Sequence, residues 1–354
     1  MVDGFWAGKR VLVTGHTGFI GSWMCLWLHR LGAEISGIAI DPPSQPNLFE
    51  VARVSDLIAD ERHDIRDAAS VVEAVQRLRP EIVFHLAAQS LVRPGYATPV
   101  ATFATNVMGT VHVLEALRST PGVAAAVVMT SDKCYANDDS GRAMTESDPL
   151  GGYDPYSSSK AAAEIVAASY RDSFLREKGV PLATVRAGNV IGGGDWAADR
   201  LLPDIVRAFS ANKAVRIRNP LSTRPWQHVL DPVAGCLALA KALATRGNEF
   251  AEAWNLGPDA SQSKSVSHIA GLAARIWGQG ASIEADIQND VHEAHLLRLD
   301  ASKARRRLAW APAWDVDRAV AESLSWYKAH LSGDDMQRYS LTQIAAFAAG
   351  NSND

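Results

Sequence analysis

The chain of 354 residues contains only three cysteines, Cys25, Cys134 and Cys236. They lie far apart and match no zinc-binding spacing, and an odd number argues against a framework of disulfide bonds. We therefore expect no metal site, and reduced thiols of the kind found in a cytoplasmic protein.

An excess of charge of one sign is also lacking. The sequence has 35 Lys and Arg against 39 Asp and Glu, and no block of five or more basic residues. This pattern argues against a nucleic-acid partner and against a membrane-binding basic helix. No apolar run approaches the length of a membrane span, and the first ten residues, MVDGFWAGKR, lack the apolar core of a signal peptide. A small molecule is the expected partner.

Short, nearly continuous apolar runs alternate with helical patterns in the first half of the chain. Such runs are typical of parallel strands whose sheet is covered by helices on both faces. The sequence therefore predicts an α/β fold with a doubly wound parallel sheet of the Rossmann type. The expected strands are 10–15, 34–40, 81–89, 123–131 and 182–190, and the expected helices are 19–31, 104–118 and 156–177.

A glycine-rich turn, TGHTGFIG at residues 14–21, lies between the first expected strand and the first expected helix. Its glycines permit a tight turn, close approach of the backbone to phosphate, and free N–H groups at the positive helix end. This predicts a dinucleotide site, and the alternative, a chance glycine turn, is disfavoured by the preceding strand. The cofactor contacts expected here are Gly15, Thr17, Gly18, Phe19, Ile20 and Gly21.

Asp41 ends the second expected strand, twenty positions after Gly21. A carboxylate there accepts hydrogen bonds from an adenosine ribose and repels a 2′-phosphate, so NAD is favoured over NADP. The alternative is that Asp41 only opens the turn at Pro42 and Pro43. Asp64 is a weaker candidate for the adenine end, with a solvated surface carboxylate as its alternative. The remaining expected cofactor contacts are Ile65, Leu86, Ala87, Ala88 and Thr130.

The segment YSSSK places Tyr156 and Lys160 four residues apart at the start of an expected helix, so both side chains project from one face. A phenol with a pKa of about 10 is a weak base at neutral pH, and a nearby ammonium group is expected to lower that pKa. Lys160 can also hold a cofactor ribose. An ordinary surface pair is the alternative.

Ser131 stands at the end of another expected strand, where open α/β sheets place ligands, and its hydroxyl can orient a substrate alcohol for Tyr156. The glycine turn, Ser131 and YSSSK together resemble the extended branch of the short-chain dehydrogenase/reductase superfamily, which acts on nucleotide sugars. The resemblance implies that hydride passes from the substrate carbon to a bound nicotinamide.

Asp132 and Lys133 follow Ser131 directly. In the nucleotide-sugar 4,6-dehydratases of this branch, the matching tripeptide supplies the alcohol-orienting hydroxyl, a general acid and a general base. The resemblance thus implies oxidation at C4, loss of water across C5 and C6, and hydride return to C6, which makes the enzyme a hydro-lyase. The alternative is that Asp132 and Lys133 form a strand-end turn and a solvated charge.

Lys133 departs from the pattern of many sugar dehydratases, which carry Glu at the matching position. To act as a base, the Lys133 amine must first lose a proton. A pKa lowered from the ordinary value to about 7.4 costs roughly 4 kcal/mol, which burial and the cation of Lys160 can supply. Stabilisation of the enolate by Lys133, with another group taking the proton, is the alternative.

Beyond about residue 189 the alternation of strands and helices ends, and separate helical patterns follow near 266–277 and 315–330. We predict a NAD-binding domain over residues 1–188, with a later segment at about 228–258 returning to it. Residues 189–354 are predicted to form mainly a smaller lobe that binds the substrate. The residues expected to bind the substrate are Gln89, Ser131, Asn189, Arg200, Arg216, Arg224 and Trp226, with the arginines suited to phosphate oxygens.

Several segments resemble the CDP-glucose 4,6-dehydratase family: DPPSQPNLF at 41–49, TSDKCY at 130–135, RAGNVIGGGDW at 186–196 and STRPWQHVLDP at 222–232. The resemblance implies CDP-glucose as substrate and a homodimer or homotetramer formed through helices that include the one bearing Tyr156. A nucleotide-sugar 4-epimerase, and a regulator that senses NAD or nucleotides without turnover, are the two alternatives. For Trp226 ordinary packing, and for Arg216 an exposed position, are further alternatives.

Overall fold

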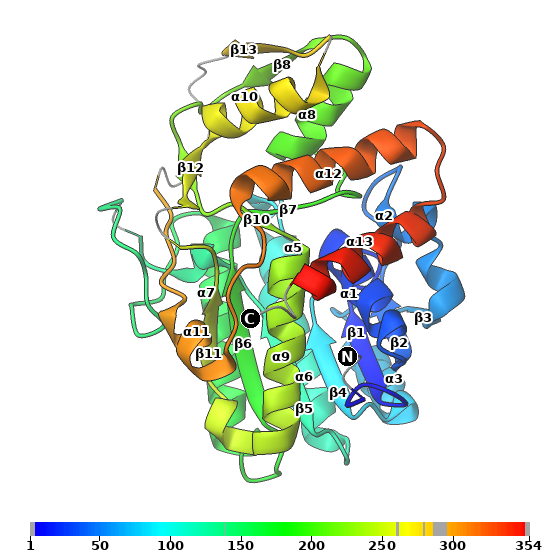
Figure 1. Ribbon diagram of the computed structural model, residues 1–354. Coiled ribbons are helices and arrows are strands. Elements are labelled where there is room, and N and C mark those ends of the chain that lie inside the picture. Colours follow the sequence, from blue (N-terminus) through cyan, green and yellow to red (C-terminus); the bar gives the residue numbers. More distant parts are fainter. Residues whose placement is uncertain (1–3, 138, 260–261, 279, 286–295, 351–354) are drawn as a thin grey trace.

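A seven-stranded parallel sheet forms the centre of the protein, as the computed structural model shows for residues 4–137, 139–259, 262–278, 280–285 and 296–350 (Figure 1). The strand order is β11-β6-β5-β4-β1-β2-β3. From β1 the sheet grows to one side through β2 and β3 and then to the other side through β4, β5, β6 and β11, as in doubly wound folds. The predicted fold class is therefore confirmed. The strands are β1 Arg10–Thr14, β2 Glu34–Ala39, β3 Ala59–Arg62, β4 Ile82–His85, β5 Ala125–Met129, β6 Leu182–Ala187 and β11 Ala253–Leu256.

Two apolar clusters pack on opposite faces of this sheet and explain why its strands are nearly continuously apolar. In β1, Val11 and Val13 belong to one cluster and Leu12 to the other, because successive strand residues point to opposite faces. Helices α1 and α9 contribute to the first cluster, and α3, α6 and α7 to the second. These helices are α1 Phe19–Arg30, α3 Ala68–Leu78, α6 Gly109–Ser119, α7 Pro155–Tyr170 and α9 Leu230–Arg246.

A smaller lobe stands at one end of the sheet, with α8, α10, β8 and β13 farthest from it (Figure 1). Its short strands pair as β7 with β10, β8 with β13 and β9 with β12. The bounds are β7 Val190–Ile191, α8 Leu201–Ser210, β8 Ala214–Ile217, β9 Thr223–Arg224, β10 Gln227–His228, β12 Lys264–Ser265, α10 Val266–Trp277, β13 Ser282–Ala285 and α12 Val316–Leu331. Outside the lobe, α11 Ser302–Leu308 packs against α9 and β11, and α13 Met336–Gly350 packs against α1. Between these segments, α9 and β11 return to the central sheet. A domain limit at residue 188 stays a prediction.

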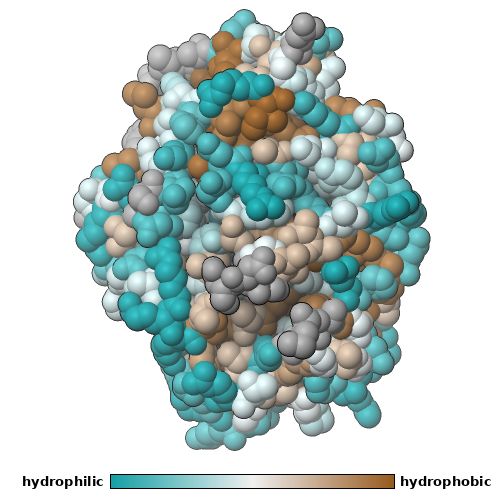
Figure 2. Space-filling model, in the orientation of Figure 1, coloured by the Kyte–Doolittle hydropathy of each residue, from teal (hydrophilic) through white to brown (hydrophobic). Residues whose placement is uncertain are grey.

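The remaining short elements lie in the connections and at helix ends. They are α2 Leu48–Val51, η1 Val54–Leu57, α4 Val92–Ala97, α5 Pro99–Phe103, η2 Ala104–Met108, η3 Asp132–Cys134, η4 Arg171–Leu175 and η5 Gly247–Phe250. The surface in Figure 2 mixes hydrophilic and hydrophobic residues, with a hydrophobic area in the region of α8 and α10.

Residues Pro99–Ser119 of α5, η2 and α6 form one continuous helix, and among the described residues it is the one helix long and apolar enough to span a membrane. The helix is longer than the 104–118 expected from the sequence. The helix packs against α3 and α7, and 44% of its most apolar window is buried. Its apolar character is therefore partly explained by its place in one layer of the α/β fold.

All five expected strands end earlier than the apolar pattern indicates, and β4 and β6 do so by the most residues. After His85 the chain leaves β4, and the backbone N–H of Leu86 donates to the carbonyl oxygen of Thr14 at 3.1 Å. Strand β6 ends at Ala187 because Asn189 adopts the left-handed conformation, with a φ of 42°. Both early ends release chain segments at the carboxyl edge of the sheet, where the candidate site lies.

Candidate active site

The turn between β1 and α1 has the shape of a phosphate cradle. Gly15 has a φ of +76°, and a Cβ there would lie 2.6 Å from the backbone nitrogen of Ala87. A Cβ on Gly21 would lie 2.1 Å from the carbonyl oxygen of Gly15, so the turn closes only with glycine at both positions. Gly18 is the N-cap of α1, which directs the positive helix end at this turn. The residues present therefore fit a dinucleotide pyrophosphate.

Hydrogen bonds fix this turn against the neighbouring strands. The hydroxyl of Thr17 donates to the carbonyl oxygen of Ile40 at 3.0 Å. The backbone N–H groups of Leu86 and Ala87 each lie 3.2 Å from Oγ1 of Thr14, to which they donate. The segments that follow β1, β2 and β4, which carry predicted cofactor contacts, are thus joined by hydrogen bonds at one edge of the sheet. Phe19 lies in the first turn of α1 and is half-buried.

Asp41 follows β2 with 90% of its side chain exposed and accepts a hydrogen bond from Nε of Arg62 at 3.1 Å. Its position beyond the glycine turn suits an adenosine ribose. Asp64 instead forms a bidentate pair with Arg66, which lowers the pKa of its carboxyl group. Ile65 is buried against Gly109. Of the two interpretations of Asp64, the surface carboxylate describes the geometry better.

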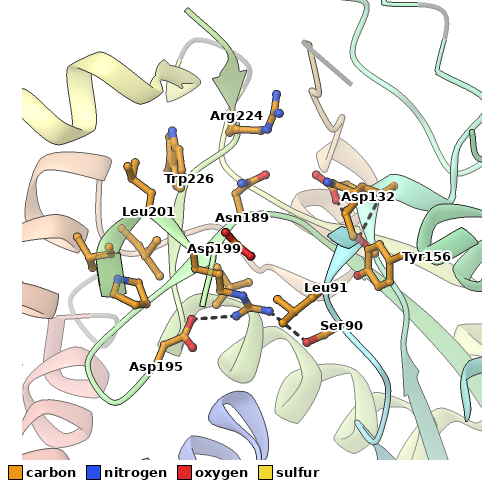
Figure 3. Close-up of a pocket in the computed structure, with 18 of the residues that line it drawn as sticks. Ser90, Leu91, Asp132, Tyr156, Asn189, Asp195, Asp199, Leu201, Arg224 and Trp226 are labelled. Carbon is orange, nitrogen blue, oxygen red and sulfur yellow. Dashed lines mark hydrogen bonds and ion pairs between the residues drawn. The ribbon is translucent and has the colours of Figure 1, made fainter. Parts of the chain in front are cut away.

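A cavity of about 330 Å³ lies at the carboxyl ends of β4, β5 and β6 (Figure 3). In Figure 3, Asp132 and Tyr156 lie on one side and Trp226 on the other, with Asn189 and Arg224 between them. The structure therefore brings the two motifs TSDK and YSSSK to one point. The predicted site residues that line the cavity are Ile20, Leu86, Ala88, Thr130, Ser131, Asp132, Lys133, Tyr156, Lys160, Asn189, Arg200, Arg216, Arg224 and Trp226.

Ser131 caps the short helix η3, which sets the direction of the next two side chains. Its Oγ accepts from the backbone N–H of Lys133 at 3.2 Å and donates to Oδ1 of Asp132 at 3.0 Å. The other carboxyl oxygen of Asp132, Oδ2, is buried and has no hydrogen-bond partner among the described residues. Burial raises the pKa of Asp132, although Lys133, Ser131 and Arg224 act in the opposite direction. A carboxyl group that keeps its proton is suited to donate it.

Tyr156 lies in the first turn of α7 and is buried. Burial raises the pKa of Tyr156 to about 12, while a hydrogen bond with Ser131 and the charge of Arg200 oppose this shift. The prediction that Lys160 would bring the pKa below its ordinary value is therefore wrong for this structure. The physical reason is that the desolvation of the phenol outweighs the hydrogen bond with Ser131 and the charge of Arg200.

Lys160 lies one turn further along α7, and its amine donates to the carbonyl oxygen of Met129 at 3.3 Å. Burial lowers the pKa of Lys160 to about 8. Thr130 lies next to it, and its hydroxyl donates to Oε1 of Glu164 at 2.5 Å. Lys133 lines the same cavity and is half-buried.

The substrate side of the cavity carries buried polar groups. Asn189 turns into it with a left-handed backbone, and its Oδ1 is buried without a hydrogen-bond partner in the part of the chain that the structure describes. Arg224 is 5% exposed, and its Nη1 donates to the carbonyl oxygen of Thr223 at 3.2 Å. Trp226 is buried and its Nε1 donates to the carbonyl oxygen of Lys264 at 2.9 Å. One wall therefore offers an amide, a guanidinium group and an aromatic ring.

Gln89 is not among the residues that line this cavity, and its role as a substrate contact stays a prediction. Its Nε2 donates to Oγ1 of Thr102 at 3.0 Å, and its Oε1 accepts from the backbone N–H of Leu91 at 2.5 Å. Both ends of the amide thus hold the loop after β4. Arg216 lies at the rim, 73% exposed, as its alternative interpretation expects.

The sequence and the fold of this chain match known proteins. Residues 11–257 match the family model described as the NAD dependent epimerase/dehydratase family. The chain belongs to this family. It is 49% identical to a CDP-glucose 4,6-dehydratase of Salmonella typhimurium over 98% of each chain, and 29% identical to a dTDP-glucose 4,6-dehydratase of Streptomyces griseus over 91% of this chain and 95% of that one.

Solved structures show the same fold. A UDP-glucose 4-epimerase of Stenotrophomonas maltophila with bound NAD has a TM-score of 0.80 at 22% identity, covering 92% of this chain and 99% of that chain. A dTDP-glucose 4,6-dehydratase of Bacillus anthracis in complex with NAD has a TM-score of 0.77 at 22% identity, covering 94% and 100%. As a member of this NAD-dependent family, the protein uses NAD as its cofactor.

Ser90, Asp195 and Asp199 make contacts that connect the walls of the cavity, and they were not predicted from the sequence. Arg200, which was predicted, donates to Oδ2 of Asp195 at 2.9 Å and to Oγ of Ser90 at 3.2 Å. Asp199 accepts from Nη1 of Arg218 at 2.7 Å and lies 3.7 Å from Nη1 of Arg93. These contacts join α4 to the loop before α8. No short motif marked them, because they come from separate segments of the chain.

Proposed function

We propose that this member of the NAD-dependent epimerase/dehydratase family is a hydro-lyase that converts CDP-D-glucose to CDP-4-dehydro-6-deoxy-D-glucose. The observation that carries the proposal is the buried carboxyl group of Asp132 in the same cavity as Ser131, Tyr156 and Lys160. Epimerisation at C4 requires only the redox and proton-transfer groups. A second acid and base serve the loss of water. The Salmonella relative, 49% identical over nearly the whole chain, supports cytidine and glucose.

The first step is oxidation of the sugar at C4. NAD bound at the glycine turn would supply the acceptor for the C4 hydride and the donor of hydride to C6. Tyr156 takes the proton of the C4 hydroxyl, and Ser131, to which Tyr156 is hydrogen-bonded, orients that hydroxyl. Lys160, fixed against Met129, holds the cofactor ribose.

The second step is the loss of water across C5 and C6. The C4 ketone makes the C5 proton acidic. Asp132, whose protonated form burial favours, donates its proton to the C6 hydroxyl as that group leaves. Lys133 has two possible roles at this stage: removal of the C5 proton, or stabilisation of the enolate while another group takes that proton. Hydride addition at C6 and protonation at C5 complete the sequence, so NAD is not consumed.

Binding of the nucleotide diphosphate is assigned to the far wall of the cavity. Asn189 and Arg224 supply an amide and a guanidinium group for phosphate oxygens, and Arg200 also lines the cavity. Trp226 offers an apolar surface, although its Nε1 is already used within the protein. Arg216, at the rim, is assigned to long-range attraction of the dianion.

Product analysis tests this proposal directly. Incubation with NAD and CDP-glucose deuterated at C4 should yield a product lighter by one water, with deuterium at C6. A product of unchanged mass would support the 4-epimerase, and no turnover would support the regulator. A panel of CDP-, dTDP-, GDP- and UDP-hexoses then tests the nucleotide, and preference for another nucleotide would overturn the substrate assignment.

We also propose that two or four copies assemble through the outer face of α5, η2, α7 and η4. This face carries an unusual set of exposed apolar side chains, namely Val100, Phe103, Met108, Ile165 and Phe174. Such a patch on a helix layer favours burial against a second copy. Ile165→Glu should reduce the mass measured by light scattering to that of one chain. Leu331→Glu, an exposed position on α12, is the matched control.

We also propose that the protein is located in the cytoplasm. All three cysteines are free and buried, as in proteins from a reducing compartment. Fractionation of the source cells with an antibody against the chain tests it, and recovery from a membrane or extracellular fraction would contradict it.

A further inference from the structure

Gly188 lies in direct contact with the carboxyl group of Asp132. Strands β5 and β6 pair in register, with Met129 opposite Val185, so the residues that follow the two strands meet at the same edge. A Cβ built on Gly188 would lie 1.9 Å from Oδ2 of Asp132, 2.3 Å from Cγ and 2.9 Å from Oδ1. The whole carboxyl group therefore occupies the space that any side chain at position 188 would need.

The backbone conformation does not explain this glycine. Gly188 is not among the glycines with a positive φ, so a left-handed backbone does not account for it. The requirement for glycine comes from the space that Asp132 fills. At Gly15, by contrast, a left-handed φ adds a conformational requirement to the close contact.

The main chain at Gly188 is also held in place. Nε2 of Gln227 donates to the carbonyl oxygen of Gly188 at 3.2 Å and to that of Leu256 at 2.9 Å. The backbone N–H of Gln227 donates to the carbonyl oxygen of Asn189 at 3.3 Å. Because Gln227 is 1% exposed and bridges three backbone groups, a new side chain at 188 would displace the Asp132 carboxyl before it displaced the strand end.

We propose that Gly188 is a positioning residue for the acid step: the missing side chain lets the Asp132 carboxyl lie against the main chain at 188, beside the cavity and within reach of Ser131. The inference rests on the proposed function and deepens it. The contact with Gly188 positions Oδ2 of Asp132, which has no hydrogen-bond partner among the described residues. Oδ1 accepts a hydrogen bond from Ser131. A shift of the carboxyl by a methyl group would break this arrangement.

Gly188→Ala tests the inference. The variant should fold, bind NAD as the wild type does and still oxidise C4, because Tyr156 and Lys160 lie outside the contact. Elimination should slow by about 100-fold, the scale of a displacement of about 1 Å in a reacting group. NADH should therefore accumulate transiently in single-turnover absorbance traces. The matched control is Gly271→Ala in α10, where the nearest outside atom is 3.9 Å from the new Cβ, and it should retain wild-type traces.

A double variant separates positioning from general damage. If Gly188 acts through Asp132, Gly188→Ala combined with Asp132→Asn should eliminate water no more slowly than Asp132→Asn alone. Two independent decreases that multiply would overturn the inference, as would turnover of Gly188→Ala within twofold of the wild type. A wild-type enzyme that releases no dehydrated product would instead refute the proposed function.

Loss of folding in Gly188→Ala also has a defined interpretation. In that event, Gly188→Ala is combined with Asp132→Gly, which removes the carboxyl from the contact. Recovery of the circular dichroism spectrum and of NAD binding in the double variant would support the assignment of the contact to Asp132. Continued failure to fold would overturn it.

Discussion

Glu164 and Arg186 form an ion pair of 2.8 Å with only 3% and 4% of their side chains exposed. The pair joins α7, which carries Tyr156 and Lys160, to β6, which leads to Asn189. Oε2 of Glu164 also accepts from the hydroxyl of Thr184 at 2.8 Å. The interior of the fold thus links both halves of the site through charge as well as apolar packing.

Glu164→Ala should therefore cost much more stability than the loss of a surface ion pair. It leaves the Arg186 guanidinium buried without its carboxylate, and breaking a buried pair typically costs about 3–5 kcal/mol. Urea unfolding followed by circular dichroism measures this. Glu249→Ala, which removes an exposed partner of Arg246, is the control and should change stability by less than about 1 kcal/mol. Equal losses in the two variants would contradict the prediction.

Asp132→Asn should separate oxidation from elimination. The amide cannot give up a proton to the leaving hydroxyl, and loss of a general acid typically slows a step by about 10²–10⁴-fold. C4 oxidation should persist, so NADH should appear and decay slowly in a stopped-flow trace. Unchanged turnover would remove Asp132 from its role. Asp56→Asn, at a position exposed by 64%, serves as control.

The pH dependence of C4 oxidation should reflect Tyr156. Because burial raises its pKa to about 12, the phenol is almost entirely protonated at neutral pH. If the phenolate is the base, its population rises about tenfold per pH unit below that pKa. The single-turnover oxidation rate should then increase with pH between about 6 and 9, and Tyr156→Phe should abolish it while NAD still binds. A flat profile would show that the free phenolate does not carry the step.

The central sheet and the convergence of TSDK with YSSSK were predictable because their signals are local. A run such as RVLVT is apolar throughout since both faces of β1 are covered, and Gly21 is demanded by a close contact within its own turn. β3 gave no such signal, because its residues Ala59–Arg62 form an edge strand with exposed side chains. The pattern of α13 was likewise not recognised.

The rest of the site depends on contacts between distant segments, which no spacing rule contains. The sequence shows Gly188 and Asp132 fifty-six positions apart, with nothing to mark their contact. The amide of Gln89 was predicted to face the substrate, yet Thr102 and the backbone of Leu91 engage it. Desolvation is the other effect that the sequence does not show. Burial raises the pKa of Tyr156, although a cation expected nearby from the sequence would lower it.

Asp231 should make the stability of the protein depend on pH. It lies in the first turn of α9 with no exposed surface, and its Oδ1 accepts from the backbone N–H of Ala313 at 2.7 Å. Its Oδ2 has no hydrogen-bond partner within the described ranges of the chain. Burial raises the pKa of Asp231 to about 7, against backbone hydrogen bonds that favour the charged form. In the unfolded chain the pKa of an Asp is about 3.9.

The folded state therefore holds the Asp231 proton more tightly than the unfolded state does. This contribution is fully present below about pH 4 and is lost as the pH rises to about 7, at up to about 1.4 kcal/mol per pH unit. Asp231→Asn removes the titration and keeps an oxygen for Ala313. Its free energy of unfolding, measured in urea from pH 5 to pH 8, should fall less steeply between pH 5 and 7 than that of the wild type. Asp317→Asn, whose carboxyl is 65% exposed, should follow the wild-type curve. Parallel curves for Asp231→Asn and the wild type would mean that the buried carboxyl is ionised throughout this range, and that its desolvation is offset by the N–H groups of Ala313, Trp314 and His228.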